Sequence, residues 1–314
     1  MKKEKTIRVC LIIFVMTFVM TFFVHAYINA AEDPKWEETL IKERLEKDEN
    51  FKKFPDSPMA RSKRLVIPTS NAETFILETA NDVLLSDKKV PDTKFSILNK
   101  EGQWIWFSHA AGVTCSAGEN PIAPGSPVTA NAFFKLGRCL LMAYPAPDRL
   151  LLMVYDPERP QFKQFSHLLY FPPDQKYAVK AVIEKFPTIE TFKVRTSQKE
   201  EKTYYRCARV TFQLEGKEFQ LTAFKFNLDT KDPEANMLFI PFSDATSGKE
   251  TYEVGRFLDI REPQGKENEV ILDFNRCYNP LCNYSHGFNC PIPPLENYLD
   301  IQIKAGEKAY PHSL

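Results

Sequence analysis

The chain has 314 residues, 43% of them hydrophobic, and its 41 basic side chains balance 41 acidic ones to a formal charge of zero. Such a chain folds into about two domains or one large all-β unit, and its composition excludes a disordered protein. The balanced charge gives no electrostatic reason to expect nucleic acid as a partner. Because 23 prolines outnumber 11 glycines, rigid turns are favoured over flexible phosphate-binding loops.

Residues 1–30 have the order of a secretory signal peptide. Four basic residues precede an apolar run over residues 9–24, and small-residue cleavage patterns end at Ala26 and Ala30. The run is short for a membrane span of about 20 residues, so we expect cleavage and a periplasmic or secreted mature chain. The alternative is an uncleaved N-terminal anchor, which is the one contact with a membrane that the sequence suggests.

Residues 31–60 are predicted to form a helix and a connector. Asp33-Pro34 is a typical helix start, and the helix is expected to end between Phe51 and Pro55. Apolar residues recur at helical spacing: Trp36, Leu40, Ile41 and Leu45. The charged residues between them predict a solvated outer face, with the helix packed on the body by its Trp36 edge.

Residues 61–160 are predicted to form a small β module, a sandwich or barrel that follows a basic connector. Short apolar runs between turn residues predict strands near residues 74–77, 94–98, 103–108, 133–135, 139–143 and 150–155. The sequence Asn99-Lys100-Glu101-Gly102 predicts a hairpin turn between two of them.

Residues 161–314 are predicted to form a second β domain. Apolar and polar residues alternate over residues 177–184 and 208–214, and Glu215-Gly216-Lys217 turns the second strand into residues 218–227. Further strands are expected at residues 237–242, 251–260, 269–274 and 299–304. The predicted fold is therefore mostly β, with antiparallel sandwich or barrel modules and one N-terminal amphipathic helix.

The densest sequence pattern lies in residues 273–308. It contains Asp-Phe-Asn, Tyr-Asn-Pro, two cysteines, Pro-Pro, Glu-Asn and Ala-Gly-Glu-Lys at fixed spacing. This signature resembles the bacterial and archaeal family catalogued as domain of unknown function sixteen eighty-four. The resemblance implies a longer member of that family with an extra N-terminal β module, and the family name supplies no activity.

Three interpretations of this segment remain open. Its Asp, Asn and Tyr residues satisfy backbone groups beside prolines in a C-terminal strap that closes the barrel. Alternatively, six side chains form a binding or catalytic pocket: Arg256, Asp273, Asn275, Tyr278, Asn297 and Glu307. The third interpretation is a zinc or copper site at Cys282, His286 and Cys290.

Export leaves an even number of cysteines in an oxidising compartment: Cys115, Cys139, Cys207, Cys277, Cys282 and Cys290. Cys282 and Cys290 are separated by seven residues that include Gly287, and we predict a disulfide between them. The pairing of the other four is left open.

Two classes of function remain. The first is an exported envelope module that binds a small ligand or an envelope protein, and the second is a hydrolase-like extracytoplasmic enzyme with a polar pocket in its C-terminal domain. Neither a G-x-S-x-G nor an H-E-x-x-H motif is present, and a chain from residue 31 has four histidines. The binding module is therefore favoured, and no cofactor is predicted.

Overall fold

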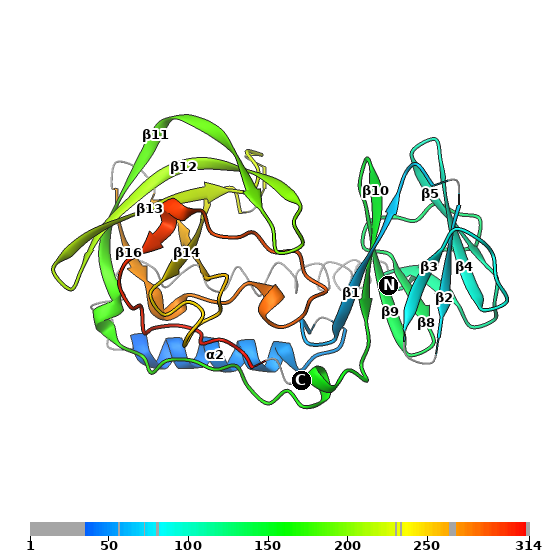
Figure 1. Ribbon diagram of the computed structural model, residues 1–314, viewed down its shortest axis with the longest axis horizontal. Helices are drawn as coiled ribbons and strands as arrows, with labels where there is room; N and C mark the ends of the chain where they lie inside the picture. The colour runs from blue at the N-terminus through cyan, green and yellow to red at the C-terminus, as the bar shows by residue number, and fades with distance from the viewer. Residues whose placement is uncertain are drawn as a thin grey trace, which may run out of the picture. The chain divides into compact units, whose positions relative to one another are not determined.

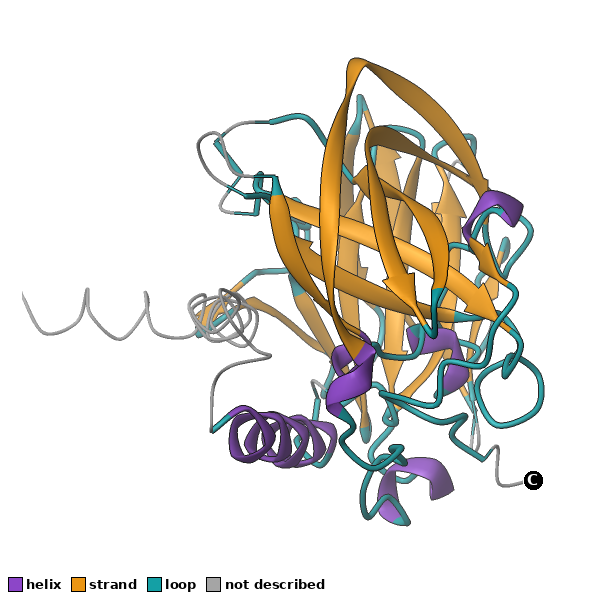
Figure 2. Ribbon diagram, turned by 90° about the vertical axis from the view of Figure 1, so that its left-hand side faces the viewer, coloured by secondary structure: helices purple, strands orange, loops and turns teal. Residues whose placement is uncertain are grey.

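The computed structural model describes residues 35–311, except residues 56, 72, 80, 81, 230, 233 and 264–267. The predicted signal peptide lies outside the described residues. The fold is mostly antiparallel β with one long helix, which confirms the predicted fold class (Figures 1 and 2). Among the described residues, no helix combines the length and the apolar character needed to span a membrane.

The chain divides into two compact units, which are described separately. In the described residues, unit 1 contains residues 35–47, 168–280 and 290–311, and unit 2 contains residues 48–167 and 281–289. The start of the helix therefore belongs to unit 1, and residues 281–289 belong to unit 2.

Unit 1 is built on one sheet with the strand order β15-β14-β13-β12-β11-β16, and β17 pairs with β14. Its strands are β11 (Ala178–Arg195), β12 (Glu201–Leu214), β13 (Lys217–Lys225), β14 (Met237–Asp244), β15 (Arg256–Arg261), β16 (Glu269–Asp273) and β17 (Tyr298–Leu299). After β16 the chain reaches β15, where Phe257 and Tyr278 form an antiparallel bridge. This bridge brings the two ends of the sheet together, so the sheet is nearly closed into a barrel.

The hairpin between β12 and β13 confirms the predicted turn. Leu214 pairs with Lys217, and the two residues between them, Glu215 and Gly216, have φ angles of 51° and 76°. Two positive φ angles define a type I′ turn, whose twist matches that of the flanking strands. Two predicted strands are shorter in the structure: β15 begins at Arg256, and β17 is only two residues long.

Helix α2 (Trp36–Phe51) has the predicted extent and runs along the barrel beside β16 (Figures 1 and 2). Trp36 and Leu40 are buried and pack with Ile271 of β16. The rest of the predicted apolar stripe is wrong, since Ile41 is 44% and Leu45 59% exposed.

The inward face of α2 continues with charged residues instead. Glu43, Arg44 and Lys47 all bond to the barrel, so the prediction of a solvated face is wrong for these three. They lie on the Trp36–Leu40 side because a helix repeats every 3.6 residues.

Unit 2 contains two antiparallel sheets around one core. The six-stranded sheet contains β1 (Arg61–Pro68), β10 (Arg149–Tyr155), β9 (Cys139–Pro145), β8 (Phe133–Leu136), β6 (Thr114–Ala117) and β7 (Asn120–Pro121). The four-stranded sheet contains β3 (Val83–Ser86), β2 (Glu73–Glu78), β4 (Thr93–Lys100) and β5 (Gln103–Ser108), and a short helix α3 (Pro160–Lys163) follows β10. Side chains from both sheets share one hydrophobic core, as in a sandwich.

Two sequence predictions in unit 2 have opposite outcomes. The hairpin at Glu101-Gly102 is confirmed, with φ angles of 53° and 84° between paired Lys100 and Gln103. The basic connector after residue 60 is in fact strand β1. Its residues Leu65 and Ile67 alternate into the core, while Lys63 and Arg64 lie nearer the surface.

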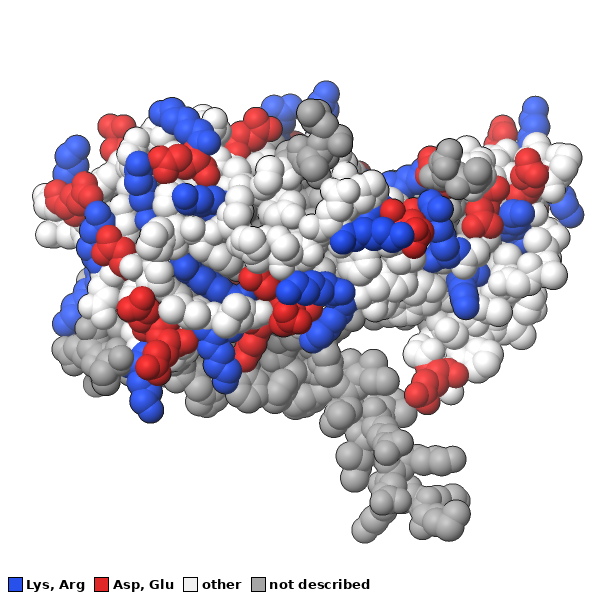
Figure 3. All heavy atoms as spheres, turned by 90° about the horizontal axis from the view of Figure 1, so that it is seen from below, with Lys and Arg blue, Asp and Glu red and all other residues white. Residues whose placement is uncertain are grey.

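The surface carries both signs of charge. On the face seen in Figure 3, Lys and Arg side chains are interspersed with Asp and Glu side chains. No large field of one sign forms on this face, in agreement with the zero formal charge.

Candidate functional site

Asp273, at the end of β16, is a buried hydrogen-bonding centre of unit 1. Its Oδ2 accepts from Trp36 Nε1 at 2.8 Å and from Arg276 Nε at 3.3 Å. Its Oδ1 accepts from the backbone nitrogen of Asn275 at 3.0 Å and from Asn275 Nδ2 at 2.9 Å. Arg276 in turn pairs with Glu43 of α2. Both oxygens of the carboxylate therefore serve to connect the helix to the barrel.

Arg44 makes a second connection between α2 and the barrel. It donates to the backbone oxygen of Phe171 at 2.9 Å and to that of Asn275 at 3.2 Å, and it lies 4.5 Å above the Tyr170 ring. Burial lowers the pKa of this guanidinium. Two carbonyls and an aromatic face thus hold a cation that we expected to be solvated.

Arg256 is completely buried within the barrel. It donates to Asp244 Oδ2 at 2.5 Å, to the Ile303 oxygen at 2.8 Å and to the Ala305 oxygen. The backbone nitrogen of Thr246 donates to the other Asp244 oxygen at 2.6 Å. The guanidinium therefore holds the irregular C-terminal segment, which has few ladder hydrogen bonds, against the sheet.

Glu307 and Tyr278 lie near the end of α2. Lys47 donates to Glu307 Oε1, and the backbone nitrogen of Asn279 donates to Oε2 at 2.8 Å. Tyr278 donates its hydroxyl hydrogen to Asp259 Oδ2 at 2.5 Å, and Lys47 lies 5.1 Å from the Tyr278 ring centre. Burial raises the pKa of Asp259 to about 6, although the hydrogen bond from Tyr278 acts in the opposite direction.

Asn297 fastens the 3₁₀ turn Leu295–Asn297 to the barrel wall. Its Oδ1 accepts from the Thr222 nitrogen at 2.7 Å, and its Nδ2 donates to the Thr222 oxygen at 2.9 Å and to the Pro241 oxygen at 2.8 Å. These three hydrogen bonds fix the backbone position of the neighbouring Glu296.

The six residues predicted for a pocket share one environment. Five of them are at most 1% exposed, and Tyr278 is half-buried. Each of the six makes at least one side-chain hydrogen bond to the backbone or to another side chain, although Arg256 Nε makes none, and this is the arrangement of the strap interpretation. A direct contact of these six with a ligand stays a prediction.

The cysteine predictions have separate outcomes. All six described cysteines are buried, and none of them is disulfide-bonded in the structure. A unit boundary falls between Asn289 and Cys290, so residues 282–290 do not form one loop within a single unit. The Cys282–Cys290 bridge stays a prediction for non-reducing peptide mapping. Within the described residues, Cys282, His286 and Cys290 do not form a group that could hold a metal ion.

A groove of about 470 Å³ lies where β11 and β12 leave register. Lys185 pairs with Ala208, but the next pair is Glu190 with Arg206, so β11 advances five residues while β12 advances two. Residues 186–189 lie opposite the single residue Cys207, so they bulge out of the ladder and form one wall of the groove. Pro187 suits this position because it has no N–H to donate to a neighbouring strand.

A second bulge, on β12 at Cys207, turns the side chain of Arg206 toward the same groove. Arg206 lies opposite Phe224 of β13, and Arg209 lies opposite Thr222, because Cys207 is an extra residue on β12. Side chains three residues apart on a regular strand point to opposite faces. The bulge places Arg206 and Arg209 on one face, two register positions or about 7 Å apart along the strand.

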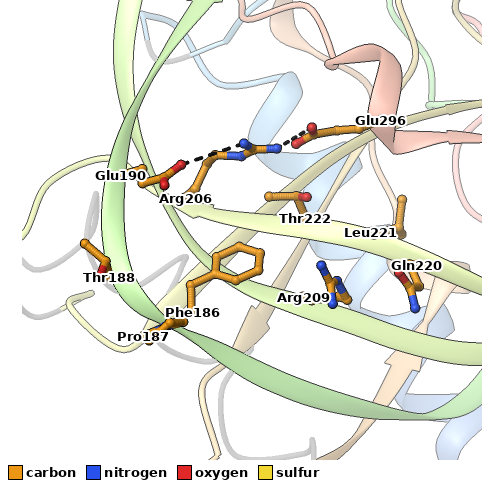
Figure 4. Close-up of a pocket in the computed structure, with 10 residues that line it drawn as sticks. All are labelled: Phe186, Pro187, Thr188, Glu190, Arg206, Arg209, Gln220, Leu221, Thr222 and Glu296. Carbon is orange, nitrogen blue, oxygen red and sulfur yellow. Dashed lines mark hydrogen bonds and ion pairs between the residues drawn. The ribbon is translucent and has the colours of Figure 1, made fainter.

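Figure 4 shows how the groove is lined. Its residues are Phe186, Pro187, Thr188, Glu190, Arg206, Arg209, Gln220, Leu221, Thr222 and Glu296. Arg206 donates to Glu296 and lies 4.0 Å from Glu190, whereas Arg209 lies 4.0 Å from Glu184. Arg209 therefore presents a guanidinium that its nearest carboxylate does not reach at hydrogen-bond distance.

Sequence reasoning missed this groove. Two sequence features coincide with it: the alternation in β11 is interrupted at Phe186-Pro187, and β12 places two small residues, Cys207 and Ala208, in succession. Only the proline is a recognised sign of a bulge or an interrupted ladder, and the pair of small residues does not by itself indicate one. That the two bulges lie side by side is visible only in the paired sheet.

Comparisons with known proteins place the C-terminal part of the chain. Residues 163–308 match the model of a family described as Protein of unknown function (DUF1684). Among solved structures, an uncharacterised protein of Haloarcula marismortui, determined by solution NMR, is 35% identical. The match covers 49% of this chain and 82% of that one, with a TM-score of 0.40. A search of curated proteins finds no match.

Proposed function

The chain belongs to the family described as Protein of unknown function (DUF1684), and we propose that its unit 1 is a binding module for a small organic anion. The groove between the bulges of β11 and β12 is the proposed site. The observation that carries the proposal is the pair of guanidiniums, Arg206 and Arg209, that the bulge brings to one face of the groove.

The size and lining of the groove support this function. Its volume of about 470 Å³ lies in the range of small-molecule sites. Arg209, with 48% of its side chain exposed, offers a planar fork that binds a carboxylate through two parallel hydrogen bonds. Thr188, Gln220 and Thr222 add hydroxyl and amide groups that suit a polar ligand.

Binding is favoured over catalysis by the position of the most perturbed carboxyl group. Asp259, whose pKa is raised to about 6, is a suitable proton donor or acceptor near neutral pH. It is not among the residues that line the groove. The carboxylates that do line the groove, Glu190 and Glu296, both face Arg206, which is the arrangement of a charge-paired binding surface.

We further propose that the module works outside the cytoplasm. This proposal is supported by the basic, apolar and small-residue order of residues 2–31. N-terminal sequencing of the exported protein tests it. We expect a chain that begins near residue 27 or 31, and a chain recovered from the cytosol with Met1 in place would contradict it.

Calorimetric titration of the full chain tests the binding function. The probes are propionate, succinate and inorganic phosphate at fixed ionic strength. We expect at least one of them to bind with a Kd below about 1 mM, and Arg209→Gln to weaken that binding tenfold or more.

Arg195→Gln is the matched control, because it removes an exposed arginine of the same sheet that does not line the groove. It is expected to bind like the wild type. If none of the probes binds, or if both variants bind like the wild type, the groove is not the site.

A further inference from the structure

We infer that the groove selects dicarboxylates, with one carboxylate on Arg209 and the other on Arg206, where it displaces Glu296. This inference rests on the proposed function and names its ligand class. It also gives Glu296 a role as an internal competitor for the second anion position.

The two arginines are spaced to hold two separate anionic groups. They lie on the same face at register positions two residues apart, which is about 7 Å along the strand. A monocarboxylate can engage only one of them. A short, flexible dicarboxylate is long enough to reach from one guanidinium to the other.

Glu296 occupies Arg206 in a contact that a ligand carboxylate can replace. One nitrogen of Arg206 holds Glu296, while the nearest oxygen of Glu190 is 4.0 Å away and beyond hydrogen-bond distance. The side chains of Arg206 and Glu296 are 27% and 36% exposed. Ion pairs in contact with water are easily exchanged, so a ligand carboxylate that bonds two nitrogens can replace Glu296.

The exchange needs no movement of the backbone. Asn297 keeps its three hydrogen bonds to Thr222 and Pro241 while the Glu296 side chain rotates outward. Glu296 projects from a turn, and its neighbour Leu295 is 95% exposed, so space is available on the solvent side.

Two further carboxylates near the arginines disfavour a ligand with more than two negative charges. Glu184 lies near Arg209, and Glu190 lies near Arg206. A third carboxylate on the ligand would meet these two groups without a third arginine in the lining. Two anionic groups are therefore favoured over three.

Titration of succinate and propionate against the full-length wild type and four variants, Arg209→Gln among them, tests the inference. Succinate is expected to bind the wild type at least tenfold more tightly than propionate. Glu296→Gln should tighten succinate threefold or more and leave propionate unchanged, because only the dicarboxylate competes for Arg206. Arg206→Gln should reduce succinate to the affinity of propionate.

Glu218→Gln is the control for overall charge, since it removes an exposed carboxylate of β13 outside the groove. If it tightens succinate as much as Glu296→Gln, displacement of Glu296 is wrong. If the two acids bind equally and both depend on Arg209, the dicarboxylate inference fails while the proposed function stands. If neither acid nor phosphate binds, both fail.

Discussion

The ammonium group of Lys47 is hydrogen-bonded to the carboxylate of Glu307, 260 residues further along the chain. Glu307 is 1% exposed, and its other oxygen accepts a hydrogen bond from the backbone of Asn279. The pair joins the N-terminal helix to the C-terminal strap inside unit 1. Residues 36–47 of the helix are thus a structural part of unit 1.

Replacing Lys47 tests this connection. Lys47→Met leaves the Glu307 carboxylate buried without its cation, and we expect the free energy of unfolding to fall by about 2 kcal/mol. The full penalty of an uncompensated buried charge is not reached because Lys47 is 28% exposed. Urea unfolding measures the change. Lys42→Met, at a side chain that is 77% exposed, should change stability by less than about 0.5 kcal/mol. Equal effects of the two variants would contradict the account.

Replacing Arg256 tests whether its hydrogen bonds hold the C-terminal strap against the sheet. Arg256→Lys keeps the charge opposite Asp244 but loses the fork that reaches Ile303 and Ala305. We expect a loss of about 3 kcal/mol, seen as a Tm lowered by roughly 10 °C. Arg195→Lys, on the exposed side of β11, should leave Tm within about 1 °C. An Arg256→Lys protein with the wild-type Tm would show that these bonds do not hold the strap.

Alanine substitutions at Gly306 and Gly216 distinguish the effect of a steric clash from the effect of backbone strain. Both have positive φ angles, 71° and 76°, so an alanine is strained by about 1 kcal/mol at either position. A Cβ at Gly306 would also contact Cys277 and lie 2.8 Å from the Phe274 oxygen, whereas nothing lies within 4 Å at Gly216. Gly306→Ala should therefore lower the free energy of unfolding by at least 2 kcal/mol more than Gly216→Ala. Similar losses in urea unfolding would contradict this close approach.

Asp259 predicts a pH dependence of stability. Folding raises its pKa from 3.8 to about 6, so the folded state binds the proton more tightly than the unfolded state. The resulting stabilisation is present below about pH 4 and is lost as the pH rises through about 6. Asp259→Asn keeps an acceptor for the Tyr278 hydroxyl and cannot ionise. We expect it to be about 2 kcal/mol more stable than the wild type at pH 7.5 and equal to it at pH 4.

Urea unfolding at the two pH values checks the Asp259 prediction. The exposed residue Asp300 provides the control variant Asp300→Asn, which should follow the wild type at both pH values. An Asp259→Asn protein whose stability changes with pH as the wild type's does would show that Asp259 is not the group responsible.

Local rules predicted the hairpins but not the polar face of α2. The turns at Glu101-Gly102 and Glu215-Gly216 follow from the positive φ angles that two-residue loops need, and this need is visible in four residues of sequence. A solvated helix face and one that forms buried ion pairs contain the same residue types. Arg44 and Lys47 differ from their neighbours only through partners more than 100 residues away.

The candidate site was harder to predict than the hairpins, because it too depends on contacts between residues far apart in the sequence. The density of polar side chains in residues 256–308 favoured residues such as Arg256 and Asp273, which the structure shows to be buried and hydrogen-bonded within unit 1. Their burial arises because an irregular, proline-rich strap needs side-chain partners for its backbone. The groove lies elsewhere, since Arg206 and Arg209 share a face only through the extra residue Cys207.

An NMR titration of the full chain with succinate tests most directly whether the groove at Arg206 and Arg209 binds small organic anions. We expect saturable amide shifts confined to residues 186, 188–190, 206–209, 220–222 and 296, and we expect Arg209→Gln to abolish them. Shifts centred on another part of the chain, or no saturable shift at all, would contradict binding at the groove.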